Sequence, residues 1–143
     1  MSPEEYIKNN EVLQLATSSN NQPRICNLHY AYDDSLNFYW MSSRYRSHSV
    51  ELKSNKRTAA SVLHSPDKKQ CVHMEGEAYE LSGDEATRAH DIYGSRFGQK
   101  PERLIEAQSN DPKTRAYYVF RPSLFVLFDE KNFPEDPRKE YRS

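Results

Sequence analysis

The sequence predicts a mainly β fold, an antiparallel β-barrel with inserted helices. Six or seven short segments rich in β-branched and aromatic residues follow one another with turn residues between them, in the order of a meander. The helices are inserted late into this meander and do not alternate with every strand as in a βαβ sheet. The 143 residues, with ten Tyr, six Phe and one Trp, match the size of one domain (1–143) with a packed aromatic core.

The first half of the chain reads as one short helix, three strands and a second helix. The first helix begins where Ser2 precedes Pro3, because proline suits the first helical position. The strands end in clusters of Asn, Asp and Ser, which favour turns, and they cover 11–17, 24–32 and 36–42. Beyond them the spacing changes from period two to helical, which predicts a short helix over 47–54.

The second half returns to strands around two further helices. Strands are expected over 57–64 and 70–82, with Gly76 marking a bulge or a close backbone approach in the second of them. Helices are expected over 83–97 and 101–108, and two last strands are separated by Pro122: 115–122 and 124–130. The proline-rich, charged tail 133–143 is expected to be loose. Residues 93–112 fit either a lid or a surface helical hairpin.

Charge and cysteine content exclude several classes of function. Twenty basic and twenty-one acidic side chains give a net charge of −1, so no overall field recruits nucleic acid and any anion site must be local. Two cysteines and a polar start without an apolar leader favour reduced thiols in the cytoplasm. The apolar runs, such as 124–128, are too short to span a membrane.

The most informative motif is the polar run between the third strand and the helix over 47–54. A phosphate at this point could accept hydrogen bonds from free helix N–H groups, from serine hydroxyls and from a guanidinium. The side chains that fit this role are Arg46, Ser47 and His48, with Ser42 in support from the strand end. The alternative is a solvated, serine-capped helix start with surface arginines.

The strand that begins at Arg24 could lie along a flat ring. Arg24 and Cys26 project to one face, and Asn27 and His29 project to the other. The alternative is a strand of mixed polarity at a solvated edge. Cys26 and His29 together with Cys71 and His73 also have the composition of a zinc site, but Cys26 and His29 point to opposite faces, so no metal is expected.

Five segments together resemble the pyridoxamine 5′-phosphate oxidase-like family of FMN-binding proteins. They are Leu15-Ala16-Thr17, Pro23-Arg24-Ile25-Cys26-Asn27-Leu28, Phe38-Tyr39-Trp40-Met41-Ser42, Arg46-Ser47-His48 and Glu75-Gly76-Glu77-Ala78-Tyr79-Glu80-Leu81. The resemblance implies a six-stranded antiparallel split β-barrel and a homodimer with FMN at its interface. It implies that Ser42, Arg46, Ser47 and His48 hold the phosphate. It implies that Arg24, Cys26, Asn27, His29 and Met41 line the flavin and that Gln70 reaches it across the dimer.

Two departures from the family pattern bear on the reaction. The vitamin-B6 oxidase has an Arg-Lys pair where this chain has Ser47-His48, and its tryptophan- and arginine-rich substrate segment has no counterpart in 125–143. The expected function is therefore an FMN-dependent oxidoreductase of unknown substrate, without a protein acid or base that the sequence singles out. The alternatives are a flavin-binding, storage or stress-related protein without turnover, a binder of a deazaflavin or haem, and an empty barrel that acts as an interaction module.

Overall fold

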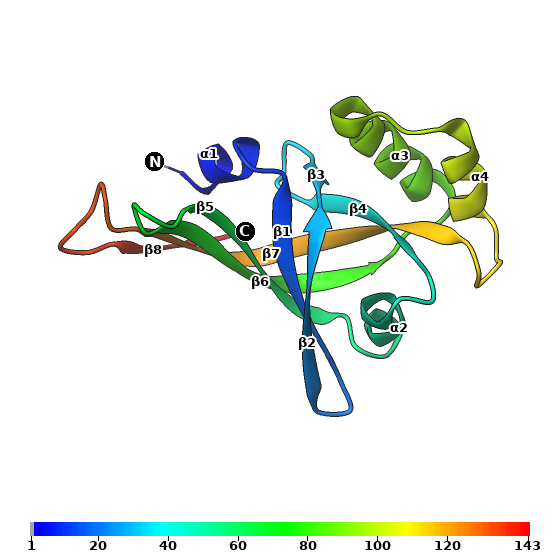
Figure 1. Ribbon diagram of the computed structural model, residues 1–143, viewed down its shortest axis with the longest axis horizontal. Helices are drawn as coiled ribbons and strands as arrows, with labels where there is room; N and C mark the ends of the chain where they lie inside the picture. The colour runs from blue at the N-terminus through cyan, green and yellow to red at the C-terminus, as the bar shows by residue number, and fades with distance from the viewer. Residues whose placement is uncertain (1) are drawn as a thin grey trace.

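The computed structural model describes residues 2–143 and consists of one curled antiparallel sheet with helices at its ends (Figure 1). Its elements in chain order are α1 (Pro3–Lys8), β1 (Val12–Ser19), β2 (Gln22–His29), β3 (Ala31–Tyr32), β4 (Phe38–Ser43), α2 (Ser47–Ser54), β5 (Arg57–Ser65), β6 (Gln70–Glu80), α3 (Gly83–Phe97), α4 (Pro101–Gln108), β7 (Arg115–Asp129) and β8 (Arg138–Arg142). The strands are ordered β2-β1-β5-β6-β7-β4-β3, and β8 pairs with β7. The described residues thus form eight strands, where six or seven were predicted.

The sheet curls because its two ends are joined through a corner at Tyr30. The sequence predicts one strand over 24–32, but the Tyr30 N–H donates to Glu11 O at 2.9 Å, and the next two residues leave β1 and pair with β4 instead. β2 and β3 thus lie at opposite ends of the strand order although they are consecutive in the chain. The result is a half-barrel in which β2 has no strand on its outer edge among residues 2–143.

Pro122 does not end the seventh strand, contrary to the prediction of two strands separated there. β4 pairs with β7 up to Phe120, and β8 pairs with it from Leu124 onward, so Pro122 lies between two partners on that edge and its missing N–H interrupts neither ladder. On the other edge Pro122 lies opposite Gly76, at the predicted bulge. A Cβ on Gly76 would lie 2.1 Å from Arg121 O, so only glycine permits this approach.

The C-terminal tail is ordered in part. The prediction of a loose tail over 133–143 is wrong for Arg138–Arg142, which form β8 and pair with Leu124 to Phe128 of β7. The charged sequence of β8 does not indicate a strand, because four of its five residues are exposed and its pairing with β7 is made by backbone hydrogen bonds. Among residues 2–143, every helix is too short or too polar to cross a lipid bilayer.

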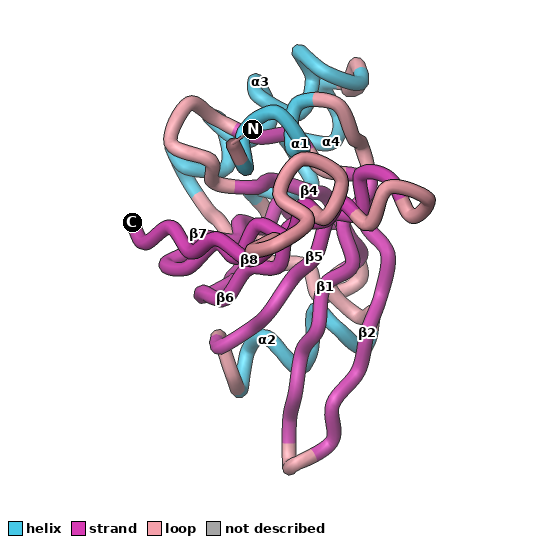
Figure 2. Tube along the Cα trace, turned by 90° about the vertical axis from the view of Figure 1, so that its left-hand side faces the viewer, coloured by secondary structure: helices cyan, strands magenta, loops and turns pink. Residues whose placement is uncertain are grey.

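Two apolar clusters fill the space on either side of β4 and β7. The first occupies the barrel interior, where Trp40 stacks on Tyr118 with ring centroids 5.8 Å apart. The second lies between the sheet and the α3–α4 pair, and its buried members are Tyr39, Leu81, Ala86, Ala89, Ala107, Tyr117 and Val119. α2 lies on one side of the molecule and α3 and α4 lie on the other, as both views show (Figure 1 and Figure 2).

Asp129 is a fully buried carboxylate at the end of β7. Burial works to raise its pKa, but hydrogen bonds from Asn132 and Gln70 outweigh burial and lower the pKa from 3.8 to about 2. Because the folded pKa is below the unfolded one, the ionised carboxylate stabilises the fold above pH 4, and this contribution is lost as pH falls towards 2.

We expect Asp129→Asn to lower the free energy of unfolding by about 2 kcal/mol at pH 7 and by clearly less at pH 2.5. Urea unfolding at the two pH values measures the difference. Asp136→Asn, at a carboxylate that is 76% exposed, is the control and should change little at either pH. If Asp129→Asn lowers the free energy of unfolding equally at both pH values, the low pKa assigned to Asp129 is wrong.

Candidate functional site

The turn between β4 and α2 places an uncapped helix start beside the open edge of β2. Arg46 is the N-cap residue of α2 in an extended conformation, and its side chain makes no capping hydrogen bond. The Arg46 N–H donates to Ser43 O at 3.2 Å, which closes the turn. The first N–H groups of α2 therefore have no side-chain acceptor at the N-cap, which is the arrangement that an anion can complete.

A cavity of about 390 Å³ separates this helix start from β2. Its lining residues come from the two elements that the sequence singled out: Pro23, Arg24, Ile25 and Cys26 from β2, and Ser47 and His48 from α2. Ser42 joins them through a hydrogen bond of 3.0 Å between its Oγ and His48 Nε2. Arg24, Cys26, Ser42, Ser47 and His48 are thus brought together from three elements.

Glu51 is a member of this cluster that the sequence reading missed. It lies one turn along α2 from Ser47, and its side chain is 11% exposed. Its Oε2 accepts from Arg24 Nε at 2.5 Å, and its Oε1 accepts from Thr17 Oγ1 at 2.9 Å. The spacing of three and four residues from His48 and Ser47 was the available signal, because such residues share a helix face.

Burial and neighbouring charges determine the protonation states of the side chains that line the cavity. Burial lowers the pKa of His48, the Arg46 charge lowers it further, and Glu51 acts in the opposite direction. Burial, and then the charge of Glu51, raise the pKa of Cys26 to about 11. At neutral pH the cavity therefore holds a neutral imidazole, a neutral thiol and the Arg24–Glu51 ion pair, with the exposed Arg46 as a further positive charge.

The other residues predicted to line a ring lie farther along β2 and β4. Asn27 and His29 are exposed on the face of β2 opposite to Cys26, as the alternation of the strand requires. His29 meets the edge of Phe97 with ring centroids 6.0 Å apart. Met41 is half-buried on β4, and its Sδ accepts from Gln99 Nε2 at 3.5 Å. Phe97 and Gln99, at the α3–α4 link, were not singled out from the sequence.

Gln70 is not brought to this cluster. It lies at the first position of β6, its side chain is buried, and its Nε2 donates to Asp129 Oδ1 at 3.0 Å. The side chains at the next outward positions, Cys71 and His73, face away from the barrel interior, with Sγ and Nε2 3.6 Å apart. Among residues 2–143 no group of three or more His, Cys, Asp and Glu side chains is placed to hold a metal ion.

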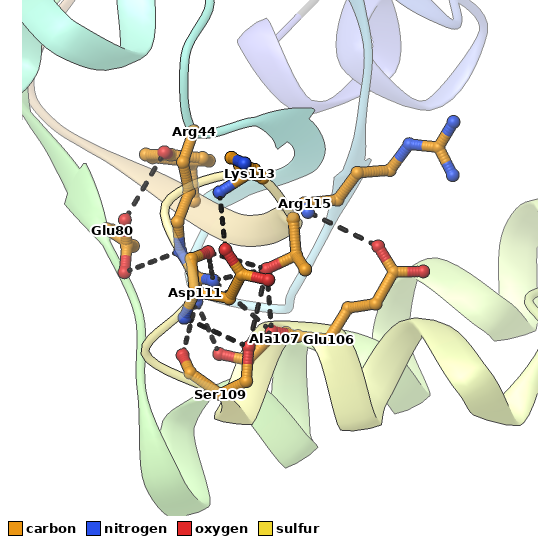
Figure 3. Close-up of polar contacts among 10 residues, drawn as sticks. Arg44, Glu80, Glu106, Ala107, Ser109, Asp111, Lys113 and Arg115 are labelled. Atoms are coloured by element: carbon orange, nitrogen blue, oxygen red, sulfur yellow. Dashed lines mark hydrogen bonds and ion pairs between the residues drawn. The ribbon is translucent and has the colours of Figure 1, made fainter.

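Arg44 connects the turn between β4 and α2 to the α3–α4 pair. Its guanidinium is 5% exposed and pairs with Glu80 at 3.3 Å. Its terminal nitrogens donate to the end of α4 and the loop that follows, as Figure 3 shows: to the carbonyls of Glu106, Ala107, Ser109 and Asp111 and to Thr114 Oγ1, at 2.6 to 3.3 Å. Residues 93–112 thus form the helical hairpin of the two sequence-based alternatives, packed on the sheet and bonded to Arg44, the residue that follows β4.

Comparisons with known proteins agree on the fold. No family model and no curated protein matches the sequence. Solved structures do match: a pyridoxamine 5′-phosphate oxidase-related, FMN-binding protein of Nostoc punctiforme has a TM-score of 0.65 and 14% identity, over 98% of this chain and 90% of that one. The chain has the pyridoxamine 5′-phosphate oxidase-like fold.

Other solved structures with this fold belong to proteins with different roles. HutZ, the haem-storage protein of Vibrio cholerae, has a TM-score of 0.68 and 16% identity, over 83% of this chain and 86% of that one. General Stress Protein 26 of Bacillus anthracis has a TM-score of 0.68 and 13% identity, over 99% of this chain and 95% of that one. At these identities the shared property is the pyridoxamine 5′-phosphate oxidase-like fold, and the role of this chain has to be argued from its own site.

Proposed function

We propose that this protein binds FMN as a cytoplasmic homodimer, with the flavin phosphate in the cavity between β2 and α2. The observation that supports this most is the convergence of Arg24, Ser47 and His48 on one cavity beside a helix start whose N-cap side chain makes no capping hydrogen bond. A phosphate monoester is an acceptor-only dianion, and a guanidinium, a hydroxyl, an imidazole and free amides are the donors that suit it.

The open edge of β2 fits the rest of the cofactor. β2 pairs with β1 alone among residues 2–143, so the backbone N–H and C=O groups of its other edge are available to a planar heterocycle. Cys26, Asn27 and His29 lie along this strand, Met41 lies on β4, and Phe97 adjoins His29 at the far end. In this proposal Arg24, Ser42, Arg46, Ser47 and His48 hold the phosphate, and the residues along β2 orient the ring.

A second copy is proposed to cover the outer face of β2, β1 and β5. Small and apolar side chains lie on this face: Ala16, Ile25, Ala59, Ser61 and Leu63, with Ile25 72% and Leu63 51% exposed. Charged side chains on the same face, Arg57 of β5 and Glu75 and Glu77 of β6, border them. The outward position at the start of β6 is Cys71, since Gln70 bonds to Asp129 inside its own barrel. We therefore do not retain Gln70 as the residue that reaches the partner's flavin.

Bound FMN would supply electron and hydride transfer, so an oxidoreductase acting on a small molecule is our first candidate reaction. A storage or stress-related role without turnover, or the binding of haem, is the second candidate, and it is favoured by the likeness in fold to HutZ and General Stress Protein 26. The outward-facing His29 and His73 are the imidazoles available to a haem iron.

The visible spectrum of the purified protein, before and after FMN is added, tests the proposal. We expect flavin absorption bands, release of a ligand with the mass of FMN on heating, and twice the monomer mass in size-exclusion chromatography with light scattering. A monomer that stays colourless and ignores added FMN would contradict it, and release of haem would select the second candidate. Bleaching of the bound flavin by NADH or NADPH under exclusion of air, with recovery in air, separates turnover from storage.

The low pKa of His48 makes FMN affinity depend on pH. A phosphate beside the ring stabilises the protonated imidazole, so binding takes up a proton. We expect FMN to bind about three- to tenfold more tightly at pH 6 than at pH 8. His48→Gln is the control, because it keeps a hydrogen-bonding side chain but does not titrate, and any effect of the phosphate's own ionisation is common to both proteins. The same pH dependence in both would contradict the role of His48.

A further inference from the structure

Glu51 and Arg24 form a connection between α2 and the β1–β2 hairpin directly beside the cavity. Thr17 and Arg24 are partners in the β1–β2 register, so their side chains lie next to each other on the inner face of the hairpin. Both donate to the Glu51 carboxylate, one to each oxygen. A buried carboxylate is costly unless it is paired, and here both oxygens have a donor.

The contact fixes Arg24 without using up its hydrogen-bonding capacity. A guanidinium has five N–H donors, and among residues 2–143 the only bond of the Arg24 side chain is the one from Nε to Glu51. The side chain is 54% exposed and lines the cavity. The four remaining N–H donors are thus on a side chain whose position is already set, at a surface that a ligand can reach.

We propose that Glu51 is a positioning residue that makes this site selective for phosphate monoesters. This inference rests on the proposed function. By holding Arg24 through Nε, Glu51 removes the conformational freedom that a long side chain would otherwise lose when the ligand binds. Its own negative charge is compensated by Arg24 at 2.5 Å, so the ligand meets an oriented ion pair with the guanidinium lining the cavity.

The obvious objection is that a carboxylate near a phosphate weakens binding. Around the cavity the charged and titratable groups are His48 and Glu51 on α2, Arg46 at its N-cap, and Arg24 and Cys26 on β2. Without Glu51, Arg24 loses the one side-chain hydrogen bond that it makes among the described residues, and a side chain that is 54% exposed would then be held less firmly. The loss of positioning is therefore expected to exceed the gain from removing one compensated charge.

The test compares FMN with riboflavin, which lacks the phosphate, by fluorescence titration of purified variants. Glu51→Gln and Glu51→Asp are expected to weaken FMN binding about tenfold and to leave riboflavin binding within about twofold of the wild type. Glu51→Asp keeps the charge but shortens the side chain, so it separates position from charge. Glu102→Gln, at an exposed carboxylate of α4, is the matched control and should change neither affinity.

A double-variant cycle decides whether Glu51 acts through Arg24. Arg24→Gln should also weaken FMN binding, and the variant with both changes should bind FMN no more weakly than Arg24→Gln alone. Circular dichroism of each variant shows whether it is folded. Additive losses, or FMN binding by Glu51→Gln as tight as the wild type or tighter, would overturn the inference. A wild-type protein that binds FMN and riboflavin equally would instead overturn the proposed phosphate site itself.

Discussion

Arg44→Ala is expected to lower the free energy of unfolding by about 3–5 kcal/mol, the largest single-residue effect on stability that we predict. The side chain is 5% exposed, pairs with Glu80, and donates to four backbone carbonyls at the end of α4 and in the loop that follows, and to Thr114. Its removal would leave these acceptors buried without a donor, and each unsatisfied group is destabilising. Urea unfolding of the two proteins measures the difference.

Two further variants make this result specific. Arg44→Lys keeps the charge but has three donors instead of five, and it lacks the planar fork that reaches several carbonyls at once, so it should lose most of the same stability. Arg138→Ala removes an exposed arginine with one carboxylate partner, Glu140 at 2.8 Å, and should cost no more than about 1 kcal/mol. If Arg44→Ala is no more destabilising than Arg138→Ala, the anchoring role of Arg44 is wrong.

Replacing Arg46 and His48 together by alanine is expected to weaken FMN binding about 100-fold or more, because the hydrogen bonds of a guanidinium and of an imidazole to the phosphate are lost. Riboflavin binding should stay within about twofold, since the ring contacts are assigned to β2. Fluorescence titrations with the two ligands give both affinities.

The control for this double change is Lys53→Ala, which removes a basic side chain from the last turn of the same helix. It should leave both affinities unchanged. If the Arg46/His48 variant retains FMN as well as the wild type does, the phosphate does not bind at the start of α2.

Local sequence signals were sufficient for most of the elements. The helices over 47–54 and 101–108 have the predicted bounds, because Asn55 and Pro101 mark their ends in the sequence itself. The strand count was wrong where it depended on neighbours distant in the chain. Pro122 would end the strand only if another strand were hydrogen-bonded to β7 at that position. β4 stops before Pro122 and β8 begins after it, and residues 115–130 alone do not reveal this arrangement.

As with the fold, part of the candidate site could be predicted from the sequence. Arg24, Ser47 and His48 were singled out by residue type and order, and they line one cavity. Glu51 was missed because a lone glutamate on a helix has the pattern of a solvated residue, and only the position of the β1–β2 hairpin buries it. Gln70 lies in the barrel interior, and the alternation carried that signal: Gln70, Val72 and Met74 share one face, and the two apolar residues mark that face as the interior.

The location of the phosphate is the claim on which the rest depends, and backbone amide NMR tests it most directly. The ¹H–¹⁵N shifts of the protein are compared on addition of FMN and of riboflavin. We expect both ligands to shift amides of β2, and FMN alone to shift those of Ser47, His48 and Ser49 strongly, because their N–H groups lie at the start of α2. If FMN shifts these three amides no more than riboflavin does, the phosphate does not bind there.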